Sequence, residues 1–400
     1  MPGPGVYFFG EEERQEVGDV LASGYLSRYG RDEDPNFKQK VYTLEREFAR
    51  IIGTRYCVAV NSGTSALMAS LVAIGLQPGD EVLVPGYTFI ASMSAVIAVG
   101  GVPVLVEVDH SLTMDPVDAE SKITPRTRVI MLVHMLGNPC DMERILALAE
   151  KYHLHVIEDG CQALGGSYGG RRLGGFGRLG TFSLNNYKVI NSGDGGLLVT
   201  GERELYERAF AFHDQGHLPL RKGVEIGHRT LIGINMRMNE LTGAFALGQL
   251  KKLDVILSTL REKKGKLKGA IQAGDIRNMR FRRINDPGEC ATLLTVQFES
   301  TEAADQVARA LSSKTVYYSG WHVYNNMEQL LEYQDASGKR PYQRHMLPKT
   351  DHILGSSINL SVGVVDPGLG ADFGINVLSP DDEIYRQAEA FIRLVKPIVG

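Results

Sequence analysis

The sequence lacks the features that mark secreted, membrane-bound or metal-binding proteins. Its cysteines form no CxxC pair, so they indicate neither a zinc site nor a disulfide framework, and we expect no metal. No run of residues is apolar enough to span a membrane, and the first residues, MPGPGVYFFGEEE, lack the pattern of a signal peptide. We therefore expect a cytoplasmic protein without a membrane partner.

A net positive charge is also missing. The 400 residues include 43 Lys and Arg against 47 Asp and Glu, which gives a formal charge of -4. Nucleic-acid-binding proteins usually carry a basic surface, so we expect no nucleic-acid partner. This composition is typical of a globular protein that binds small molecules.

What the sequence does contain is an alternation of short apolar strands and helical segments between residues 56 and 212. This alternation predicts a large α/β/α domain with a mainly parallel sheet, whose binding groups gather at the carboxyl ends of the strands. From about residue 271 the predicted elements are fewer and mixed, as in a small α+β domain. We predict a large domain over residues 1–255 and a small one over residues 256–400.

One turn between a predicted strand and a predicted helix could bind an anion. The apolar run Tyr56–Val60 leads through Asn61-Ser62-Gly63-Thr64 into a helical segment. Free backbone N–H groups and the positive end of the helix dipole meet at such a turn, and a phosphate fits there. The alternative is that Ser62 or Thr64 only caps the helix.

Two predicted strand ends carry side chains that suit a planar ligand. Phe89 follows the strand that begins at Glu81, and its ring is available for stacking. Glu158 and Asp159 follow the strand His155–Ile157, where Asp159 could hold a protonated ring nitrogen with Gln162 nearby. The alternative is that these acids are solvated turn residues.

The stretch TFSLNNYKVINSGDGGLLVT contains a single cation, Lys188, between two predicted strands. Apolar neighbours and closely spaced glycines suggest a sheltered lysine with a lowered pKa, which suits Schiff-base chemistry on a carbonyl. Taken alone, the stretch also fits a solvated surface lysine. Together with the phosphate turn, Phe89 and Asp159, however, Lys188 completes the set that pyridoxal phosphate needs. Lys188 would hold the aldehyde of this cofactor and then move the α proton of an amino acid.

Several segments resemble the DegT/DnrJ/EryC1/StrS family of pyridoxal-phosphate sugar aminotransferases, namely NSGTSAL, PGYTFIAS, VIEDGCQALGG, TFSLNNYKVINSGDGG and GINMRMNELTGAFALGQLKKLD. The resemblance implies fold type I, the aspartate-aminotransferase fold, and a homodimer with shared active sites. It implies the Schiff-base lysine at Lys188, the partner of the pyridine nitrogen at Asp159, and other cofactor contacts at Gln162, Phe89, Gly63, Thr64 and Ser183. Asn235 would reach the phosphate in the neighbouring subunit.

Within the family, the runs FFGEEERQEV, VHMLGNPCDM, HDQGH and YYSGWHVYNN look most like enzymes that aminate position eight of an octulosonate sugar. The lead hypothesis is an aminotransferase that carries nitrogen from L-glutamate or L-glutamine to a sugar or cyclitol carbonyl, with pyridoxamine phosphate as the intermediate cofactor form. One alternative is a pyridoxamine-dependent sugar dehydratase, although that class resembles this family with histidine in place of Lys188. Another is a cofactor-binding regulatory or scaffold protein without turnover.

Other polar or aromatic residues have two interpretations each. Arg28 in the polar segment 24–35 could reach a ligand, although a solvated loop is the simpler interpretation. Arg237 could bind a donor carboxylate or form an ion pair at a subunit interface. His213 and the aromatic cluster around His322 could contact substrate or belong to loops and core.

A long amphipathic helix follows, with Asn239 or Thr242 near its N-cap, and is expected to continue through Arg261 and Lys268. We interpret this helix as the connection between the two domains.

Overall fold

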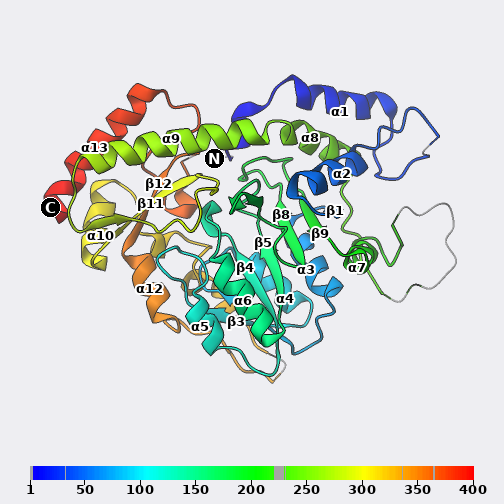
Figure 1. Ribbon diagram of the computed structural model, residues 1–400, viewed down its shortest axis with the longest axis horizontal. Coiled ribbons are helices and arrows are strands. Elements are labelled where there is room, and N and C mark those ends of the chain that lie inside the picture. Colours follow the sequence, from blue (N-terminus) through cyan, green and yellow to red (C-terminus); the bar gives the residue numbers. More distant parts are fainter. Residues whose placement is uncertain (1–2, 32, 220–228, 230, 336, 364) are drawn as a thin grey trace.

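The computed structural model describes residues 3–31, 33–219, 229, 231–335, 337–363 and 365–400 (Figure 1). The α-helices are α1 (Glu11–Ser23), α2 (Lys40–Ile52), α3 (Gly63–Ala73), α4 (Ala91–Ala98), α5 (Pro116–Ser121), α6 (Met142–Tyr152), α7 (Arg203–His213), α8 (Glu240–Leu250), α9 (Leu253–Ala273), α10 (Thr301–Ala310), α11 (Glu328–Leu331), α12 (Pro348–Gly355) and α13 (Asp381–Val399). The strands are β1 (Tyr56–Val60), β2 (Glu81–Pro85), β3 (Val102–Val106), β4 (Thr127–Val133), β5 (His155–Asp159), β6 (Ser167–Tyr168), β7 (Arg171–Arg172), β8 (Leu179–Ser183), β9 (Gly196–Thr200), β10 (Met279–Phe281), β11 (Leu293–Phe298) and β12 (Ser357–Ser361). The 3-10 helices are η1 (Pro4–Phe8), η2 (Met135–Gly137), η3 (Val316–Tyr318), η4 (Tyr324–Asn326) and η5 (Pro367–Leu369).

The centre of the fold is a seven-stranded sheet in the order β1-β9-β8-β5-β4-β2-β3. Strands β8, β5, β4, β2 and β3 are parallel to their neighbours in this order, whereas β9 is antiparallel to both β1 and β8. The apolar side chains of the strands pack against helices on both faces, with α3, α4 and α7 on one face and α2 and α6 on the other. The prediction of an α/β/α fold with a mainly parallel sheet is confirmed.

Local sequence signals explain where several helices begin. In each case a side-chain oxygen just before the helix accepts a backbone N–H of the first turn, which satisfies a donor that has no partner within the helix. The residues that cap helices in this way include Ser62 (α3), Asp141 (α6), Asn239 (α8) and Ser300 (α10). Of the two cap candidates for the helix after residue 238, the structure therefore has Asn239.

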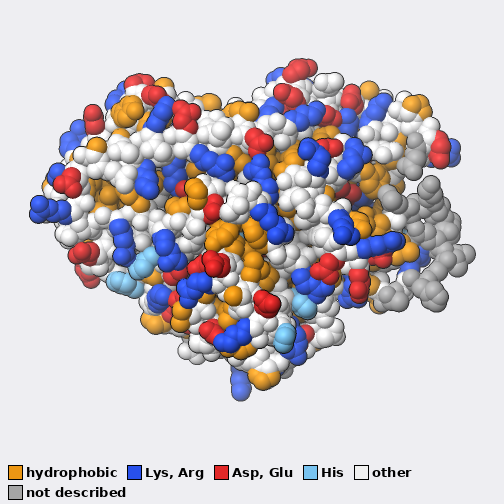
Figure 2. Space-filling view, viewed as in Figure 1, with side chains coloured by type: hydrophobic (Ala, Val, Ile, Leu, Met, Phe, Trp, Pro, Cys, Tyr) orange, Lys and Arg blue, Asp and Glu red, His pale blue; other side chains and the backbone are white. Residues whose placement is uncertain are grey.

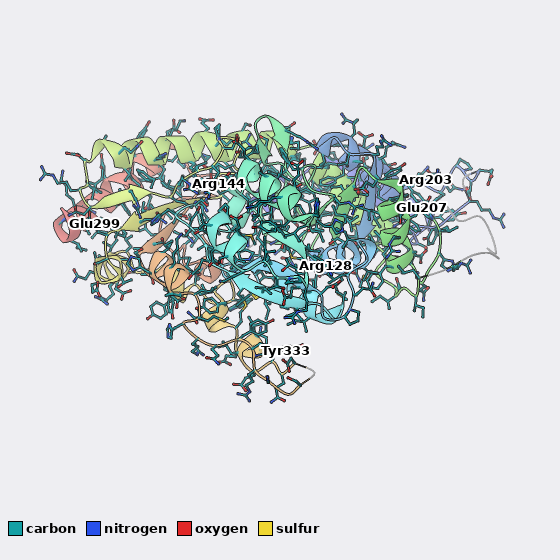
Figure 3. All side chains as sticks on the ribbon, turned by 60° about the horizontal axis from the view of Figure 1, so that its bottom comes forward. Arg128, Arg144, Arg203, Glu207, Glu299 and Tyr333 are labelled. Carbon is teal, nitrogen blue, oxygen red and sulfur yellow. The ribbon has the colours of Figure 1, made fainter. Side chains whose placement is uncertain are left out.

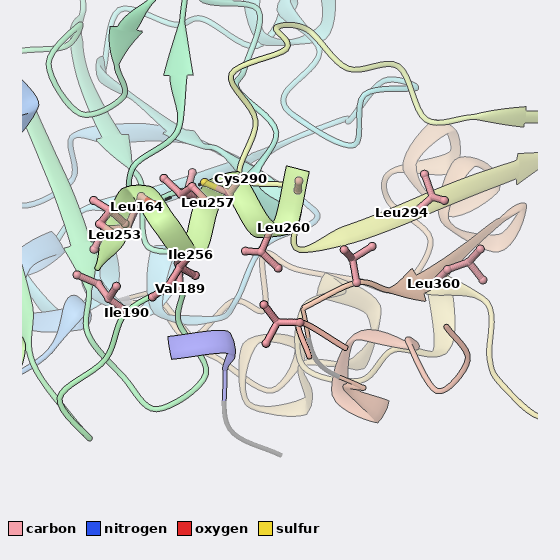
Figure 4. Close-up of a cluster of buried hydrophobic side chains, with 14 of the residues drawn as sticks. Leu164, Val189, Ile190, Leu253, Ile256, Leu257, Leu260, Cys290, Leu294 and Leu360 are labelled. Atoms are coloured by element: carbon pink, nitrogen blue, oxygen red, sulfur yellow. Dashed lines mark hydrogen bonds between the residues drawn. The ribbon is translucent and has the colours of Figure 1, made fainter. Parts of the chain in front are cut away.

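A second, antiparallel sheet in the order β10-β11-β12 lies beside α9, α10 and α13 (Figure 1). Its inward side chains Leu294 and Leu360 belong to the same hydrophobic cluster as Leu257 and Leu260 of α9 (Figure 4). Because this cluster also includes residues of the large sheet, one core is continuous between the two sheets. A domain boundary at residue 255 stays a prediction.

Two expected elements differ from those observed. The long helix after Asn239 is divided into α8 and α9, because the chain turns at Lys251 and Lys252, where Lys252 Nζ reaches Glu13 at 2.7 Å and the Phe8 carbonyl at 2.7 Å. The strand that starts at His155 also continues through Asp159 instead of stopping at Ile157. Acids are tolerated in this buried strand because backbone N–H groups and side chains bind them.

The interpretation of residues 24–35 as a solvated loop is wrong for Arg28, whose side chain is fully buried. Its Nη2 donates to both carboxylate oxygens of Glu45 at 2.9 and 3.0 Å. Its guanidinium also lies over the rings of Tyr42 and Phe210. A buried bidentate ion pair offsets the cost of removing the charge from water, so this polar segment is anchored to the core.

The surface carries interspersed charges of both signs, with no large region of one sign on the face shown in Figure 2. Figure 3 shows one helical pair, Arg203 and Glu207 of α7, and the projecting segment that contains Tyr333. Within the described ranges, no helix is both long and apolar enough to cross a membrane. The same residues include no cluster of His, Cys, Asp and Glu that could hold a metal ion.

Candidate active site

Lys188 lies in the turn that joins β8 to β9, at the carboxyl end of β8. Leu184 N–H donates to the Gly195 carbonyl at 2.9 Å, and Lys188 N–H donates to the Asn185 carbonyl at 3.0 Å. The next two residues, Val189 and Ile190, are buried beside α9 (Figure 4). The lysine is thus half-buried on a turn that is anchored in the core directly after it.

Asp159 ends β5, the strand that pairs with β8, and only 4% of its surface is exposed. Its Oδ2 accepts a hydrogen bond from Ser92 Oγ at 2.8 Å, and its Oδ1 accepts one from Cys161 N–H at 3.1 Å. Ser92 Oγ lies 2.8 Å from Thr88 Oγ1. In the part of the chain that the structure describes, no Lys, Arg or His forms an ion pair with this carboxylate.

Glu158, the other acid predicted at this strand end, has a different environment. Its side chain is completely buried and accepts the backbone N–H groups of Gly174, Phe176 and Gly177 at 2.6–2.7 Å. His134 Nε2 lies 3.1 Å from its Oε2. Glu158 therefore fixes the backbone of residues 174–177, and only Asp159 of the two acids remains a site candidate.

The turn before α3 brings predicted phosphate contacts together. Ser62 Oγ accepts Ser65 N–H at 3.1 Å, so Ser62 caps α3, and phosphate binding at the same turn stays a prediction. Among the described residues, the backbone N–H groups of Gly63 and Thr64 have no hydrogen-bond partner, as expected for the first turn of a helix. A Cβ atom on Gly63 would lie 2.8 Å from Ser183 Cβ, so the glycine allows β8 to approach the turn.

Phe89 keeps 39% of its large apolar side chain exposed directly after β2. His322 lies beside it, with ring centroids 5.5 Å apart, and its carbonyl accepts Thr88 N–H at 2.9 Å. Burial and the Lys188 cation lower the pKa of His322 to about 3. The predicted aromatic cluster consists of Trp321, His322 and Tyr324. Trp321 is exposed and Tyr324 is buried, whereas His322 lies beside Phe89 and close enough to Lys188 to interact with its charge.

Gln162 and Asn235 occupy different surroundings. Gln162 Oε1 accepts Leu136 N–H at 2.9 Å, which orients the amide group near the end of β5. Asn235 is exposed, pairs with Asp214 and accepts Arg237 N–H at 3.2 Å. Among the described residues, Asn235 forms no hydrogen bond with Lys188 or Asp159, and its role in a neighbouring subunit stays a prediction.

Arg237 and His213 both contact charged side chains of the same chain. Arg237 Nη1 forms an ion pair with Asp214 Oδ1 at 2.5 Å. His213 ends α7 and is completely buried, with its Nε2 3.1 Å from Arg28 Nη1, so the interpretation of His213 as a loop residue is wrong. The donor-carboxylate role of Arg237 stays a prediction.

A comparison with known protein families identifies the family to which this chain belongs. The family described as "DegT/DnrJ/EryC1/StrS aminotransferase family" matches residues 9–365. The chain belongs to this family. The match includes every residue that the sequence predicted for the site, from Gly63 to Asn235.

Named members of the family show the same relationship. GDP-perosamine synthase of Escherichia coli O157:H7 is 39% identical over 252 residues, which cover 63% of this chain and 66% of that protein. L-glutamine:2-deoxy-scyllo-inosose aminotransferase of Micromonospora echinospora is 40% identical over 60% of this chain and 58% of its own length. The crystal structure of 3-amino-5-hydroxybenzoic acid synthase covers 97% of both chains with a TM-score of 0.80 and 26% identity. The aligned segments thus span slightly less than two thirds of these first curated relatives, whereas the fold extends over nearly the whole chain.

Sequence reasoning missed Ser92 and Thr88 and, although it considered His322, did not place this residue beside Phe89. Ser92 and Thr88 form a hydroxyl relay to Asp159, and their spacing of four residues at a helix start is the signal that could have suggested contact. The position of His322 depends on the pairing of Tyr87 with Val323, which no local pattern indicates. A pocket of about 510 Å³ between α11 and residues 340–344 contains none of the predicted site residues.

Proposed function

We propose that the chain is a pyridoxal-phosphate-dependent aminotransferase that acts on a sugar or cyclitol carbonyl. The observation that carries this proposal is the environment of Asp159, a nearly fully buried carboxylate with two hydrogen-bond donors and no cationic partner among the described residues. A buried carboxylate normally requires a positive partner, and a protonated pyridine nitrogen supplies one.

The surrounding residues fit the other parts of this cofactor. The unpartnered N–H groups of Gly63 and Thr64, together with Ser183, suit its phosphate. The exposed ring of Phe89 suits stacking on the pyridine, and the free amide nitrogen of Gln162 suits the ring hydroxyl. Lys188, in the turn that follows β8, the strand paired with the strand of Asp159, suits the aldehyde.

When bound, pyridoxal phosphate supplies an electron sink for the carbanion left after an amino acid loses its α proton. Asp159 would pair with the pyridine nitrogen, because Ser92 and Cys161 hold its carboxylate in place at the end of β5. Lys188 Nζ would then accept the α proton of the amino donor as a general base. The presence of Lys188 supports an aminotransferase over a dehydratase.

The donor and the acceptor are part of the proposal. We propose L-glutamate or L-glutamine as the donor, which agrees with the glutamine in the name of the Micromonospora relative. For the acceptor we propose a keto sugar, an octulosonate-like aldehyde or a cyclitol ketone. The stretch YYSGWHVYNN is our candidate for part of the acceptor-binding site, because its His322 lies against Phe89.

We also propose a homodimer in which Asn235 of one copy completes the phosphate site of the other. Asn235 is exposed, and its neighbours Ile232 and Ile234 present apolar side chains to solvent, with 95% of Ile232 exposed. Large exposed apolar side chains next to a polar candidate contact are typical of an interface.

The experiment follows the visible absorbance of the protein loaded with pyridoxal phosphate before and after addition of L-glutamate or L-glutamine. We expect a lysine-dependent visible band that falls with one donor while the absorbance of the pyridoxamine form rises. The variant Lys188→Ala should lose this band, and Lys151→Ala, at an exposed lysine on α6, should keep it.

If the band of the wild-type protein and of Lys151→Ala responds to neither L-glutamate nor L-glutamine, the result would contradict the aminotransferase. It would favour a binding protein without turnover. Once a donor is known, the pyridoxamine-loaded protein is offered a GDP-linked keto sugar, a cyclitol ketone and an octulosonate aldehyde. Recovery of the visible band with one of these compounds identifies the acceptor class.

A further inference from the structure

The first described residues lie directly against the turn that carries Lys188. Gly3 N–H donates to the Asn186 carbonyl at 2.7 Å, two residues before the lysine. From there η1 continues beside Val189 and Ile190, where Figure 4 shows the start of the chain next to these two side chains. We call residues 3–8 the N-terminal segment.

A glycine is needed at position 3 because a side chain has no room there. Its backbone conformation does not require glycine. Its φ of -68° and ψ of 172° are open to any residue. A Cβ atom at this position, however, would lie 2.4 Å from the Lys188 carbonyl oxygen and 2.5 Å from the Tyr187 carbonyl carbon. Because both of these atoms are backbone, a side chain on Gly3 forces either the N-terminal segment or the lysine turn to move.

The rest of the N-terminal segment is anchored on both sides. A Cβ on Gly5 would lie 2.7 Å from the Val189 carbonyl oxygen, so a second glycine contacts the chain just after the lysine. The Phe8 carbonyl accepts a hydrogen bond from Lys252 Nζ at 2.7 Å. The ring of the following residue, Phe9, packs edge-to-face on Phe245 of α8 at 4.8 Å.

These contacts matter because the outer part of the lysine turn is exposed. Asn186, Tyr187, Gly193 and Asp194 all face solvent. A reactive side chain on a loop needs supporting contacts, since a displacement of about 1 Å can cost roughly 100-fold in rate. The N-terminal segment supplies a support that comes from outside the β8–β9 turn.

We propose that the N-terminal segment positions Lys188, and that Gly3 is a positioning residue for it. The inference rests on the proposed function, in which Lys188 Nζ is the reacting group. Gly3 acts only through the backbone of residues 186–188 and does not reach the cofactor itself.

The test compares Gly3→Ala with Gly18→Ala, which adds the same methyl group to α1 at a position with nothing within 4 Å. Both proteins are loaded with pyridoxal phosphate, and the visible band is titrated with pH before the donor half-reaction is timed. We expect Gly3→Ala to shift the titration midpoint and to slow the half-reaction by about 10- to 100-fold, with Gly18→Ala unchanged. Thermal unfolding of both variants without cofactor should begin at similar temperatures.

Equal titration midpoints and rates in the two variants would overturn the inference. Failure of the proposed function is distinguishable, because the wild-type protein would then lack a band that depends on Lys188. If Gly3→Ala does not fold, hydrogen exchange of the wild-type chain decides. The backbone amides of peptides 3–9 and 184–191 should exchange at similar rates. Rapid exchange in the first peptide alone would overturn the inference.

Discussion

Asp159 is the carboxylate that we propose as the partner of the pyridine nitrogen. Ser92 and Cys161 each donate one hydrogen bond to it, and these two bonds fix the orientation of the carboxylate. Its position at the end of β5 places it beside β8, which leads to Lys188. An amide at this position would keep the shape of the side chain and lose the charge.

We therefore expect Asp159→Asn to bind pyridoxal phosphate and to slow the donor half-reaction by roughly 100- to 1,000-fold, the range found when one electrostatic contact to a developing charge is removed. Stopped-flow absorbance measures this rate, with the amino donor that the absorbance experiment identifies. Ser92→Ala serves as the matched variant, since it removes one hydrogen-bond donor to this side chain and keeps the carboxylate. A rate for Asp159→Asn within a few-fold of Ser92→Ala would argue against a charged partner of the ring nitrogen.

A second prediction at the residue scale concerns pH. Burial, followed by the nearby Arg28 cation, lowers the pKa of His213 from 6.5 to about 3. Between these values the unfolded chain binds a proton at this histidine and the folded chain does not, so the free energy of unfolding falls as the pH is lowered. A single histidine contributes at most about 1.4 kcal/mol for each pH unit in this window.

Urea unfolding at pH 7 and pH 5 measures the effect. His213→Asn should weaken the loss of stability between these two pH values. His153→Asn changes an exposed histidine at the end of α6 and should leave the pH dependence as in the wild type. An identical pH dependence in all three proteins would show that His213 does not cause the loss of stability at low pH.

At the scale of elements, Arg28 fixes the segment between α1 and α2. Its guanidinium bonds Glu45 on α2 and the Ala59 carbonyl of β1, and it lies over aromatic rings from two helices. We expect Arg28→Met to lower the free energy of unfolding by about 3–5 kcal/mol, because it leaves the Glu45 carboxylate buried without a partner. Chemical denaturation measures the change.

Arg50→Met is the matched control, because Arg50 pairs with Glu47 on the same helix at 3.0 Å but is exposed. Exposed ion pairs contribute little, so the control should change stability by less than about 1 kcal/mol. Equal effects of the two substitutions would show that burial of the Arg28 pair has no energetic weight.

The elements of the large sheet were predictable because their apolar runs are short, regular and separated by turns. The run Tyr56–Val60 is β1 as predicted, and the cap at Asn239 begins α8. The burial of Arg28 was not predictable, since it depends on Glu45 and Phe210, which are distant in sequence. The break between α8 and α9 lies at Lys251 and Lys252, where Lys252 contacts the distant Glu13, and no proline marks it.

The same distinction applies to the site. Lys188, Asp159 and Phe89 follow strands whose carboxyl ends a parallel sheet must bring to one edge, so their proximity follows from the fold class. His322 and the N-terminal segment reach this edge through contacts between residues that are far apart in the chain. Such contacts carry no periodic signal, and only the folded structure identifies them.

At the scale of the whole molecule, the proposed dimer predicts complementation between two defective chains. Lys188→Ala retains Asn235, and Asn235→Ala retains Lys188, so a mixed dimer contains one intact site. Co-expression should restore about a quarter of the wild-type sites if the subunits assort at random. The measured quantity is the donor half-reaction per mole of protein.

Co-expression of Lys188→Ala with Asp159→Asn is the control, because these residues serve the same site of one chain. This pair should show no recovery. Recovery in the control, or none in the test pair despite a dimer by light scattering, would contradict the sharing of Asn235 between subunits.

The most direct measurement of the central claim is the identity of the residue that binds the cofactor covalently. The protein loaded with pyridoxal phosphate is reduced with borohydride, digested, and its modified peptide is sequenced by mass spectrometry. The account predicts one modified residue, Lys188, in the peptide that joins β8 to β9. Modification of another lysine, or no stable modification, would contradict it.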